Sequence, residues 1–369
     1  MSSQSNVAAE SPEAMLTGWR KDPRLIPYGG ANFGTPPEML TPRDGLIVPT
    51  DRFFVRSNGP VPTLDPATWQ LRIDGHVQHP RVLSLADLQA LPHRTLTAFL
   101  ECAGNSRTRF DPLPEGTPWR NDAIGNAEWA GVSLATVLDL AGVGPDAVDV
   151  VAQGGDFPEM RRGLPLAVAR DPDTMLVWQM NGEPLPVPHG GPVRLLVPGW
   201  AGIASTKWLV GLDVVDRAFD GFWNADNYVF WTAAKEAVRP IREMPPKSIV
   251  VSPTAGSTVS ATPQTVTGFA WSGHGRITRV EVSTDGGDSW QEATLTEEGR
   301  RSWVRFDLPW QPRPGTTHLR VRATDERGLT QPVTPDWNAK GYLMNAIQDV
   351  PVTVVSGARE PMLDTGTAR

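Results

Sequence analysis

One cysteine, Cys102, stands in a segment whose residue types could bind a metal or act as a nucleophile. Because it is the only cysteine in the 369 residues, an internal disulfide, a CxxC zinc knuckle and a CxxCH haem attachment are all excluded. Three interpretations stay open: a buried structural thiol, a nucleophile, or a single thiolate ligand to a soft metal.

The residues around Cys102 favour the ligand interpretation over that of a core residue. Cys102 ends an apolar run, residues 96–100, that is typical of a strand, and the small residues Ala103-Gly104-Asn105 follow it. Small residues let another group approach the backbone closely. Arg107 and Arg109 come next, and cationic neighbours stabilise a thiolate. The sequence therefore predicts a strand end, a tight turn and an electropositive loop.

Further motifs follow an order that resembles the sulfite oxidase family of molybdopterin enzymes. They are Phe53-Phe54-Val55-Arg56, Cys102-Ala103-Gly104-Asn105, Met180-Asn181-Gly182-Glu183-Pro184-Leu185 running into His189-Gly190-Gly191-Pro192-Val193-Arg194, Val197-Pro198-Gly199-Trp200, Lys207-Trp208-Leu209, and Tyr228 at the expected distance after Lys207. The resemblance covers about residues 40–355. Each motif is weak alone, but several in one order at matching spacing are specific.

The resemblance implies that Cys102 is the metal ligand and that the cofactor is molybdenum bound to molybdopterin. A soft thiolate suits a metal that changes oxidation state while it transfers an oxygen atom. Arg, Lys, His and backbone N–H groups suit the phosphate of such a cofactor. The residues that the resemblance assigns to the cofactor are Phe54, Val55, Arg56, Asn58, Asp156, His189, Arg194, Ser205, Thr206 and Lys207.

Several of these residues have other interpretations when the residues are considered alone. Asp156 follows two glycines and fits a turn equally well. His189, between Pro188 and a glycine, fits a solvated loop, and Arg194 fits a surface charge on a strand. The pair Arg161-Arg162 is expected on a solvated face.

On the substrate side, the resemblance implies a cationic pocket that faces the metal. Arg56 and Arg107 match positions that bind an oxyanion there, and Arg305 of the second domain is a further candidate. A guanidinium suits this task because its planar fork binds tetrahedral oxyanions through paired hydrogen bonds. Tyr228 corresponds to a tyrosine close to the metal-bound oxygen, and Trp119 is a candidate for the wall.

One position departs from the family pattern. Several members have a histidine two residues after the pocket arginine, whereas this chain has Asn58. An asparagine donates a hydrogen bond but carries neither charge nor an exchangeable catalytic proton. Cofactor binding is therefore expected to persist, while the expectation that sulfite is the substrate is weakened.

Composition divides the chain into three parts. Residues 1–40 are rich in Pro, Gly and Ser and are expected to form an extended N-terminal arm. Residues 41–241 mix short strands with short helices, with N-caps at Ser84 and Ser133, and are expected to form an α+β catalytic domain of the sulfite oxidase type that binds molybdopterin. Residues 242–369 begin with a polar, proline-containing linker and then become almost purely strand-like.

This last part is expected to form an all-β immunoglobulin-like sandwich. Asp285-Gly286-Gly287 stands between two alternating runs and predicts a hairpin, and residues 318–322 alternate in the same way. The absence of a cysteine pair excludes the disulfide-pinned antibody type. In the family, this second domain mediates homodimer formation.

Charge and hydropathy limit the partners. The formal net charge of −7 argues against nucleic acid and against an acidic membrane surface. No apolar run reaches the roughly 18 residues of a membrane span. Residues 1–20 have no basic region followed by an apolar stretch, which predicts a cytoplasmic location, or a periplasmic one if the chain is a processed form.

The function expected from the resemblance is oxidation of sulfite to sulfate by oxygen-atom transfer. No haem motif occurs in the chain, so the electrons are expected to pass to an external acceptor such as a cytochrome c. Alternatives of the same chemistry are a sulfur dehydrogenase, a nitrate reductase running the transfer in reverse, and a methionine sulfoxide reductase. A different class is a non-catalytic scaffold with the molybdopterin fold.

Overall fold

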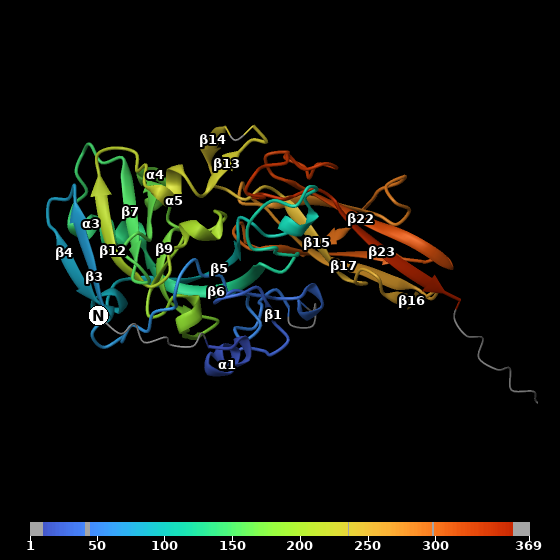
Figure 1. Cartoon of the computed structure of the whole chain (residues 1–369), viewed down its shortest axis with the longest axis horizontal. Helices are drawn as coiled ribbons and strands as arrows, with labels where there is room; N and C mark the ends of the chain where they lie inside the picture. The colour runs from blue at the N-terminus through green and yellow to red at the C-terminus, as the bar shows by residue number, and fades with distance from the viewer. Residues whose placement is uncertain (1–9, 41–44, 235, 297–298, 357–369) are drawn as a thin grey trace, which may run out of the picture.

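The computed structural model describes residues 10–40, 45–234, 236–296 and 299–356. The molecule is elongated, with a mixed part that contains the helices at one end and a purely stranded part at the other (Figure 1). No helix in these described ranges is long and apolar enough to span a membrane.

The N-terminal segment is packed against the catalytic domain. It contains α1 (Pro12–Gly18), β1 (Ile26–Pro27), β2 (Phe33–Gly34) and the 3-10 helix η1 (Pro37–Met39). Its buried side chains, Leu16, Leu25, Phe33 and Met39, form a small core with Val55. The expectation of an extended arm is therefore wrong for residues 10–40, because apolar residues spaced along the segment bury against the domain; residues 1–9 lie outside the described residues.

Two five-stranded sheets build the catalytic domain. The first has the order β10-β9-β6-β5, with β11 also paired to β9; the second has the order β4-β3-β12-β7-β8. The strands are β3 (Gln70–Gly75), β4 (Arg81–Ser84), β5 (His93–Glu101), β6 (Ile124–Ser133), β7 (Asp149–Gly154), β8 (Arg161–Pro165), β9 (Met175–Met180), β10 (Glu183–Pro184), β11 (Arg194–Leu196) and β12 (Leu209–Val215). A small ribbon of β13 (Val229–Trp231) and β14 (Ala237–Pro240) leads toward the second domain.

Short helices connect these strands. They are α2 (Leu85–Gln89), η3 (Arg107–Arg109), α3 (Leu134–Ala141), α4 (Leu166–Ala169), η4 (Val187–His189), η5 (Gly202–Ala204) and α5 (Phe222–Ala225). The predicted start of α2 is confirmed, because Ser84 and Asp87 form a reciprocal capping box. The predicted end of α3 is confirmed at Gly142, whose φ of 67° is in the left-handed region that glycine adopts without strain.

The second domain is the expected sandwich of two sheets, in which most neighbouring strands are antiparallel. One sheet has the order β15-β17-β21-β20 and the other β16-β23-β22-β18-β19. The strands are β15 (Lys247–Ser252), β16 (Thr258–Ser260), β17 (Gln264–Trp271), β18 (Ile277–Ser283), β19 (Gln291–Glu292), β20 (Thr294–Leu295), β21 (Val304–Trp310), β22 (Gly315–Asp325) and β23 (Gln348–Val355). The predicted hairpin joins β18 to β19, and Ser283 and Ser289 donate hydrogen bonds to the Asp285 carboxylate in its loop.

The two domains share buried polar and apolar contacts. One hydrophobic core includes Cys102 and Trp129 of the catalytic domain together with Trp271 of the second domain. A fully buried ion pair joins Lys247 Nζ to Glu101 Oε1 at 2.9 Å, and the Trp271 indole donates to Glu101 Oε2 at 2.7 Å. The second domain therefore supports β5 at the residue directly before Cys102.

Candidate active site

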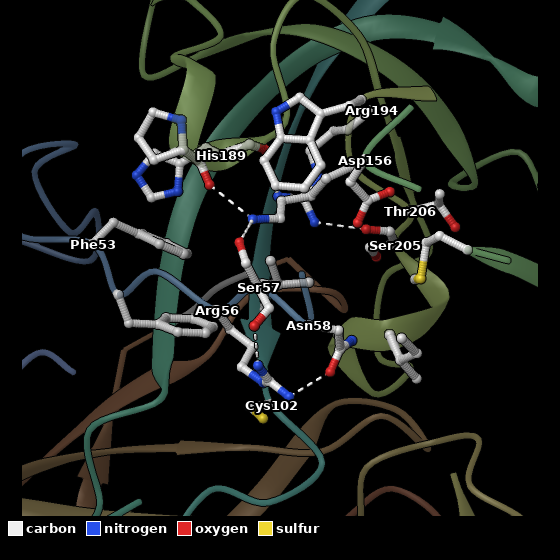
Figure 2. Close-up of a pocket in the computed structure, with 18 of the residues that line it drawn as sticks. Phe53, Arg56, Ser57, Asn58, Cys102, Asp156, His189, Arg194, Ser205 and Thr206 are labelled. Atoms are coloured by element: carbon white, nitrogen blue, oxygen red, sulfur yellow. Dashed lines mark hydrogen bonds between the residues drawn. The ribbon is translucent and has the colours of Figure 1, made fainter. Parts of the chain in front are cut away.

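Two adjoining cavities meet at Cys102. When all space not filled by protein atoms is counted, open solvent included, one contains about 700 Å³ and the other about 650 Å³, and on this basis they are called the larger and the smaller cavity. Arg56, Cys102 and Tyr228 line both. Figure 2 shows the larger cavity with Cys102 and Arg56 at one end and His189 and Arg194 at the other. An elongated ligand can therefore reach the thiol with one end and the cationic groups with the other.

The Cys102 loop has the predicted form. Cys102 follows β5, is 7% exposed and donates its N–H to Ala123 O, while Asn105 N–H donates back to Cys102 O at 2.9 Å. The Asn105 amide donates to Glu101 Oε1 at 2.8 Å. Of the two arginines in this loop, Arg107 lines the smaller cavity. Arg109 does not, because its guanidinium donates to two backbone carbonyls, at residues 346 and 347 of the second domain.

The larger cavity collects nearly all the residues assigned to the cofactor. Phe54, Arg56, Asn58, Asp156, His189, Arg194, Ser205, Thr206 and Lys207 all line it. Val55 does not: it pairs with Phe33 through the backbone, and its side chain joins the core of the N-terminal segment. This correction has a simple cause, because the chain is extended here and the Val55 side chain faces away from the cavity that Phe54 and Arg56 line.

Hydrogen bonds to backbone carbonyls and to one hydroxyl hold the cationic end of this cavity in place. Lys207 Nζ donates to Ser57 Oγ at 2.7 Å and to Pro188 O at 3.0 Å. The Arg194 guanidinium donates to His189 O and to Ser205 O, both at 2.8 Å. The loop between His189 and Arg194 needs a glycine at position 190, since a Cβ at Gly190 would lie 2.8 Å from Lys207 Cβ.

Positive charge at this end is poorly balanced by the protein. Burial lowers the pKa of Arg194 to about 9 and lowers the pKa values of Lys207 and His189, with their cationic neighbours acting in the same direction. Asp156 is the carboxylate that lines the cavity, and burial raises its pKa. Such a cluster favours an anionic ligand, because a ligand's negative charge would restore the charged forms of these groups.

The smaller cavity has the character of an oxyanion site. Its lining includes Arg56, Arg107, Trp119, Tyr228, Lys340 and Tyr342. Trp119 Nε1 is buried and has no hydrogen-bond partner among the described residues, so its N–H is available to a ligand. The rings of Tyr228 and Tyr342 stack with centroids 5.2 Å apart and form one wall.

Sequence reasoning missed two residues of this cavity and misplaced two arginines. Lys340 and Tyr342 were missed by sequence reasoning, because they lie in an irregular segment between β22 and β23 that has no motif spacing. Arg305 is not part of the cavity: it lies on β21 and forms an ion pair with Asp307 at 2.9 Å. Arg162 is not solvated either, since it is 1% exposed and donates to the carbonyls of residues 223 and 241.

Asn58, where the sequence departs from the family pattern, lines the larger cavity and contacts two residues that line both cavities. Its side-chain oxygen accepts hydrogen bonds from the Arg56 guanidinium and from Tyr228 OH, the latter at 3.4 Å. A neutral acceptor here leaves the positive charge of Arg56 available to a ligand. It also provides no second protonatable ring beside Tyr228.

The sequence matches two families along most of its length. Residues 58–223 match the Oxidoreductase molybdopterin binding domain, and residues 238–355 match the Mo-co oxidoreductase dimerisation domain. Sulfite oxidase from Arabidopsis thaliana is 32% identical over 372 residues, which cover 88% of this chain and 94% of that protein. The chain belongs to the sulfite oxidase family.

Two further relatives of this sulfite oxidase family member differ from it in length or are named for another reaction. Mitochondrial sulfite oxidase of Mus musculus is 37% identical over 354 residues, covering 88% of this chain, but this chain spans 64% of the mouse protein. The crystal structure titled sulfane dehydrogenase SoxCD from Paracoccus pantotrophus superimposes with a TM-score of 0.81 at 30% identity, covering 96% of this chain and 93% of that one.

The residues of this family member fit a molybdopterin cofactor. Asp156 Oδ1 and Thr206 Oγ1 are buried in the larger cavity without a hydrogen-bond partner among the described residues. Buried polar atoms are seldom left unpaired, so these two fit the polar edge of a bound ligand. Cys102 would hold the metal, and His189, Arg194 and Lys207 would hold the phosphate end.

Behind the smaller cavity, a buried carboxyl supports the wall of the family member's site. Tyr28 from the N-terminal segment packs on Trp119 with ring centroids 4.6 Å apart, and its OH donates to Asp122. Burial is the main cause that raises the pKa of Asp122 from 3.8 to about 6, although the hydrogen bond from Tyr28 opposes it. Between about pH 3.8 and 6, the folded protein therefore keeps a proton on Asp122, whereas the same carboxyl is ionised in the unfolded chain.

Replacing Asp122 by asparagine is expected to stabilise the protein above about pH 6. The raised pKa means that the stability Asp122 contributes is fully present below pH 3.8 and is lost as the pH rises through about 6. Asparagine can still accept from Tyr28 and has no charge to bury, so the gain at about pH 8 is up to about 3 kcal/mol. Urea unfolding of wild type and variant between about pH 4 and 8 measures it; an equal gain at both ends of this range would contradict the account.

Proposed function

We propose that this protein oxidises sulfite to sulfate and passes the electrons to an external acceptor such as a cytochrome. One observation carries the proposal: Arg56, Arg107 and Lys340 line the same cavity as Cys102. Glu115 lines this cavity too, so three cations and one carboxylate leave a net positive charge beside the metal-ligand position, which suits a small oxyanion. When bound, the molybdenum cofactor would supply the oxygen-atom transfer and the two-electron change of oxidation state.

The residues of the chain bind and orient the substrate. Arg107 is fixed by donating to Lys340 O at 3.0 Å and to Thr117 O, so its guanidinium enters the cavity in one position. Cations held in a site that is partly shielded from water attract an anion more strongly than solvated ones. The Trp119 N–H is a neutral donor beside them, and Tyr228 OH lies at the junction with the larger cavity.

We also propose that the protein acts as a homodimer through its second domain. The match of residues 238–355 to a dimerisation domain supports this arrangement. Lys340 and Tyr342, which line the substrate cavity, come from this same domain. The second domain would therefore serve both dimer formation and substrate binding.

A second candidate is the oxidation of sulfane sulfur. The similarity to the structure titled sulfane dehydrogenase, over nearly the whole of both chains, favours it. Asn58 favours it too, because an amide beside Arg56 and Tyr228 adds no charge of its own that would attract a doubly charged substrate. Both reactions would use the same cofactor, so turnover of purified enzyme with each substrate separates them.

Replacing Lys340 by methionine is expected to raise the KM for sulfite by roughly tenfold or more, with a smaller change in kcat. The oxyanion is charged in both the ground state and the transition state, so its attraction to Lys340 contributes uniformly to binding. Steady-state kinetics with an artificial electron acceptor measure the two constants.

The control is Arg217→Met, which removes the same charge from an exposed side chain outside both cavities. Unchanged sulfite kinetics in Lys340→Met would remove this residue from the substrate site. A cofactor-loaded wild type that does not turn over sulfite with any acceptor would overturn the sulfite proposal and leave the sulfane reaction to be tested.

A further inference from the structure

Lys21, in the N-terminal segment, contacts His189 at the end of the larger cavity that is assigned to the cofactor phosphate. It follows α1 and is 7% exposed. Its Nζ donates to Phe53 O at 2.7 Å and to Thr50 O, and it lies 2.9 Å from His189 Nε2. An ammonium group has three protons and no lone pair, so these three acceptors satisfy it completely.

This contact fixes which ring nitrogen of His189 carries the proton. When Lys21 is charged, its ammonium can only donate, so His189 Nε2 accepts and the neutral ring carries its proton on Nδ1. His189 stays neutral, since burial and the charges of Lys21, Lys207 and Arg194 lower its pKa, although a backbone hydrogen bond with Thr50 opposes this shift. The side chain lines the larger cavity, and with Nε2 held by Lys21, Nδ1 is the ring nitrogen whose proton remains for donation.

We propose that Lys21 is a positioning residue of the cofactor site, which holds His189 as a neutral Nδ1–H donor toward the anionic end of the cofactor. The N-terminal segment then forms part of that site. The proposal rests on the molybdopterin assignment and is independent of which sulfur compound is oxidised.

The charges that face Lys21 make this contact responsive to the ligand. Burial lowers the pKa of Lys21 to about 7, while the Asp51 carboxylate opposes that shift. An anionic group in the cavity favours the charged ammonium and therefore the Nδ1–H form of His189. Cofactor binding and the Lys21–His189 hydrogen bond are expected to strengthen each other.

A purely structural role for Lys21 is the competing explanation. Its ammonium also satisfies two backbone carbonyls, and the segment that carries it packs through Leu16 and Leu25. Removing Lys21 could then loosen the segment without acting through His189. A double-mutant cycle separates the two explanations, because only a contact that acts through His189 disappears when His189 is replaced.

The test follows cofactor release from purified holoenzyme after dilution, using pterin fluorescence and molybdenum content. Lys21→Met in the wild-type background should release cofactor about tenfold faster, the lower end of what outer partners of ligands contribute. An asparagine at position 189 presents an amide donor that needs no tautomer. Lys21→Met in the His189→Asn background should therefore change release by less than about twofold.

The matched control is Leu16→Ala, which removes packing from the same segment and leaves the ammonium in place. It should lower the unfolding temperature without speeding cofactor release. Acceleration of release by Lys21→Met that is equal in both backgrounds, or that Leu16→Ala reproduces, would show that Lys21 only anchors the segment.

An NMR spectrum of the wild-type holoenzyme provides an independent check if Lys21→Met fails to fold. Long-range ¹H–¹⁵N correlation of the holoenzyme, with His189 assigned through the His189→Asn variant, reports the protonated ring nitrogen. A proton on Nδ1 supports the proposal, and a proton on Nε2 overturns it. Neither readout uses sulfite, so a loss of the sulfite assignment would leave this result unaffected.

Discussion

Replacing Cys102 by serine is expected to lower turnover by far more than the 10–100-fold loss that is typical of outer partners of a metal ligand. A hydroxyl oxygen is a harder ligand than a thiolate and would change the potential of a bound molybdenum. The fold and the dimer should persist, because backbone hydrogen bonds to Ala123 and Asn105 hold the loop. Turnover with artificial acceptors, normalised to molybdenum content, and gel filtration measure the two expectations.

A variant with full molybdenum and undiminished turnover would remove Cys102 from the metal site. Loss of the cofactor together with activity would show that the thiolate is needed for binding as well. Cys102→Ala is the control, since it offers no ligand atom at all and separates a harder ligand from a missing one.

Replacing Lys207 by methionine is expected to weaken cofactor binding by roughly 10–100-fold and so to lower the cofactor content of the purified protein. This loss of affinity is the equivalent of about 1.5–3 kcal/mol for a charge-assisted contact. The same change should leave the cofactor-free fold nearly as stable as before. Burial lowers the pKa of Lys207, and Arg194 and Arg56 act in the same direction, so the charged group is costly without an anion. Cofactor content after purification and urea unfolding of the cofactor-free protein measure the two effects.

Lys247→Met is the control, because Lys247 is a buried lysine that, unlike Lys207, has a carboxylate partner for its ammonium. Its loss leaves Glu101 buried without its cation, which typically costs about 3–5 kcal/mol. The two lysines should therefore respond in opposite ways, one in cofactor content and the other in fold stability. A large loss of stability in cofactor-free Lys207→Met would show that its bonds to Ser57 and Pro188 support the fold.

Arg194 is a less selective probe of the same end of the cavity. Its guanidinium donates to the carbonyls of His189 and Ser205 and lies over the Trp129 ring, 5.4 Å from its centroid. Substitution would leave buried carbonyls without donors, so cofactor content and stability would fall together. Lys207 separates these effects where Arg194 does not.

Features that depend on neighbours in sequence could be predicted from the sequence. The Ser84 capping box, the glycine that ends α3 and the hairpin after β18 each need only a few consecutive residues. The tight turn after Cys102 is of the same kind. The division into a mixed domain and a stranded one also follows from local periodicity, and the matched families have the same order.

Residue types in the sequence limited the chemistry of the site without deciding it. They left the single thiol open between three interpretations, and the resemblance to the sulfite oxidase family then implied a thiolate-bound metal and a phosphate-bearing cofactor. Nearly all of these residues meet in one cavity. Only the tertiary structure decided which way Val55 faces and that Arg305 pairs with Asp307 instead of reaching the substrate.

Tertiary structure alone also brought Lys21 to His189, 168 positions apart, and Lys340 to the Cys102 cavity. A lysine in a polar segment has the same local signature whether it is solvated or buried. Its environment is set by which distant elements pack around it, here the segment at residues 50–53 and η4 for Lys21. Local sequence therefore determines residue chemistry and short elements, whereas long-range packing determines which of those residues share one desolvated cavity.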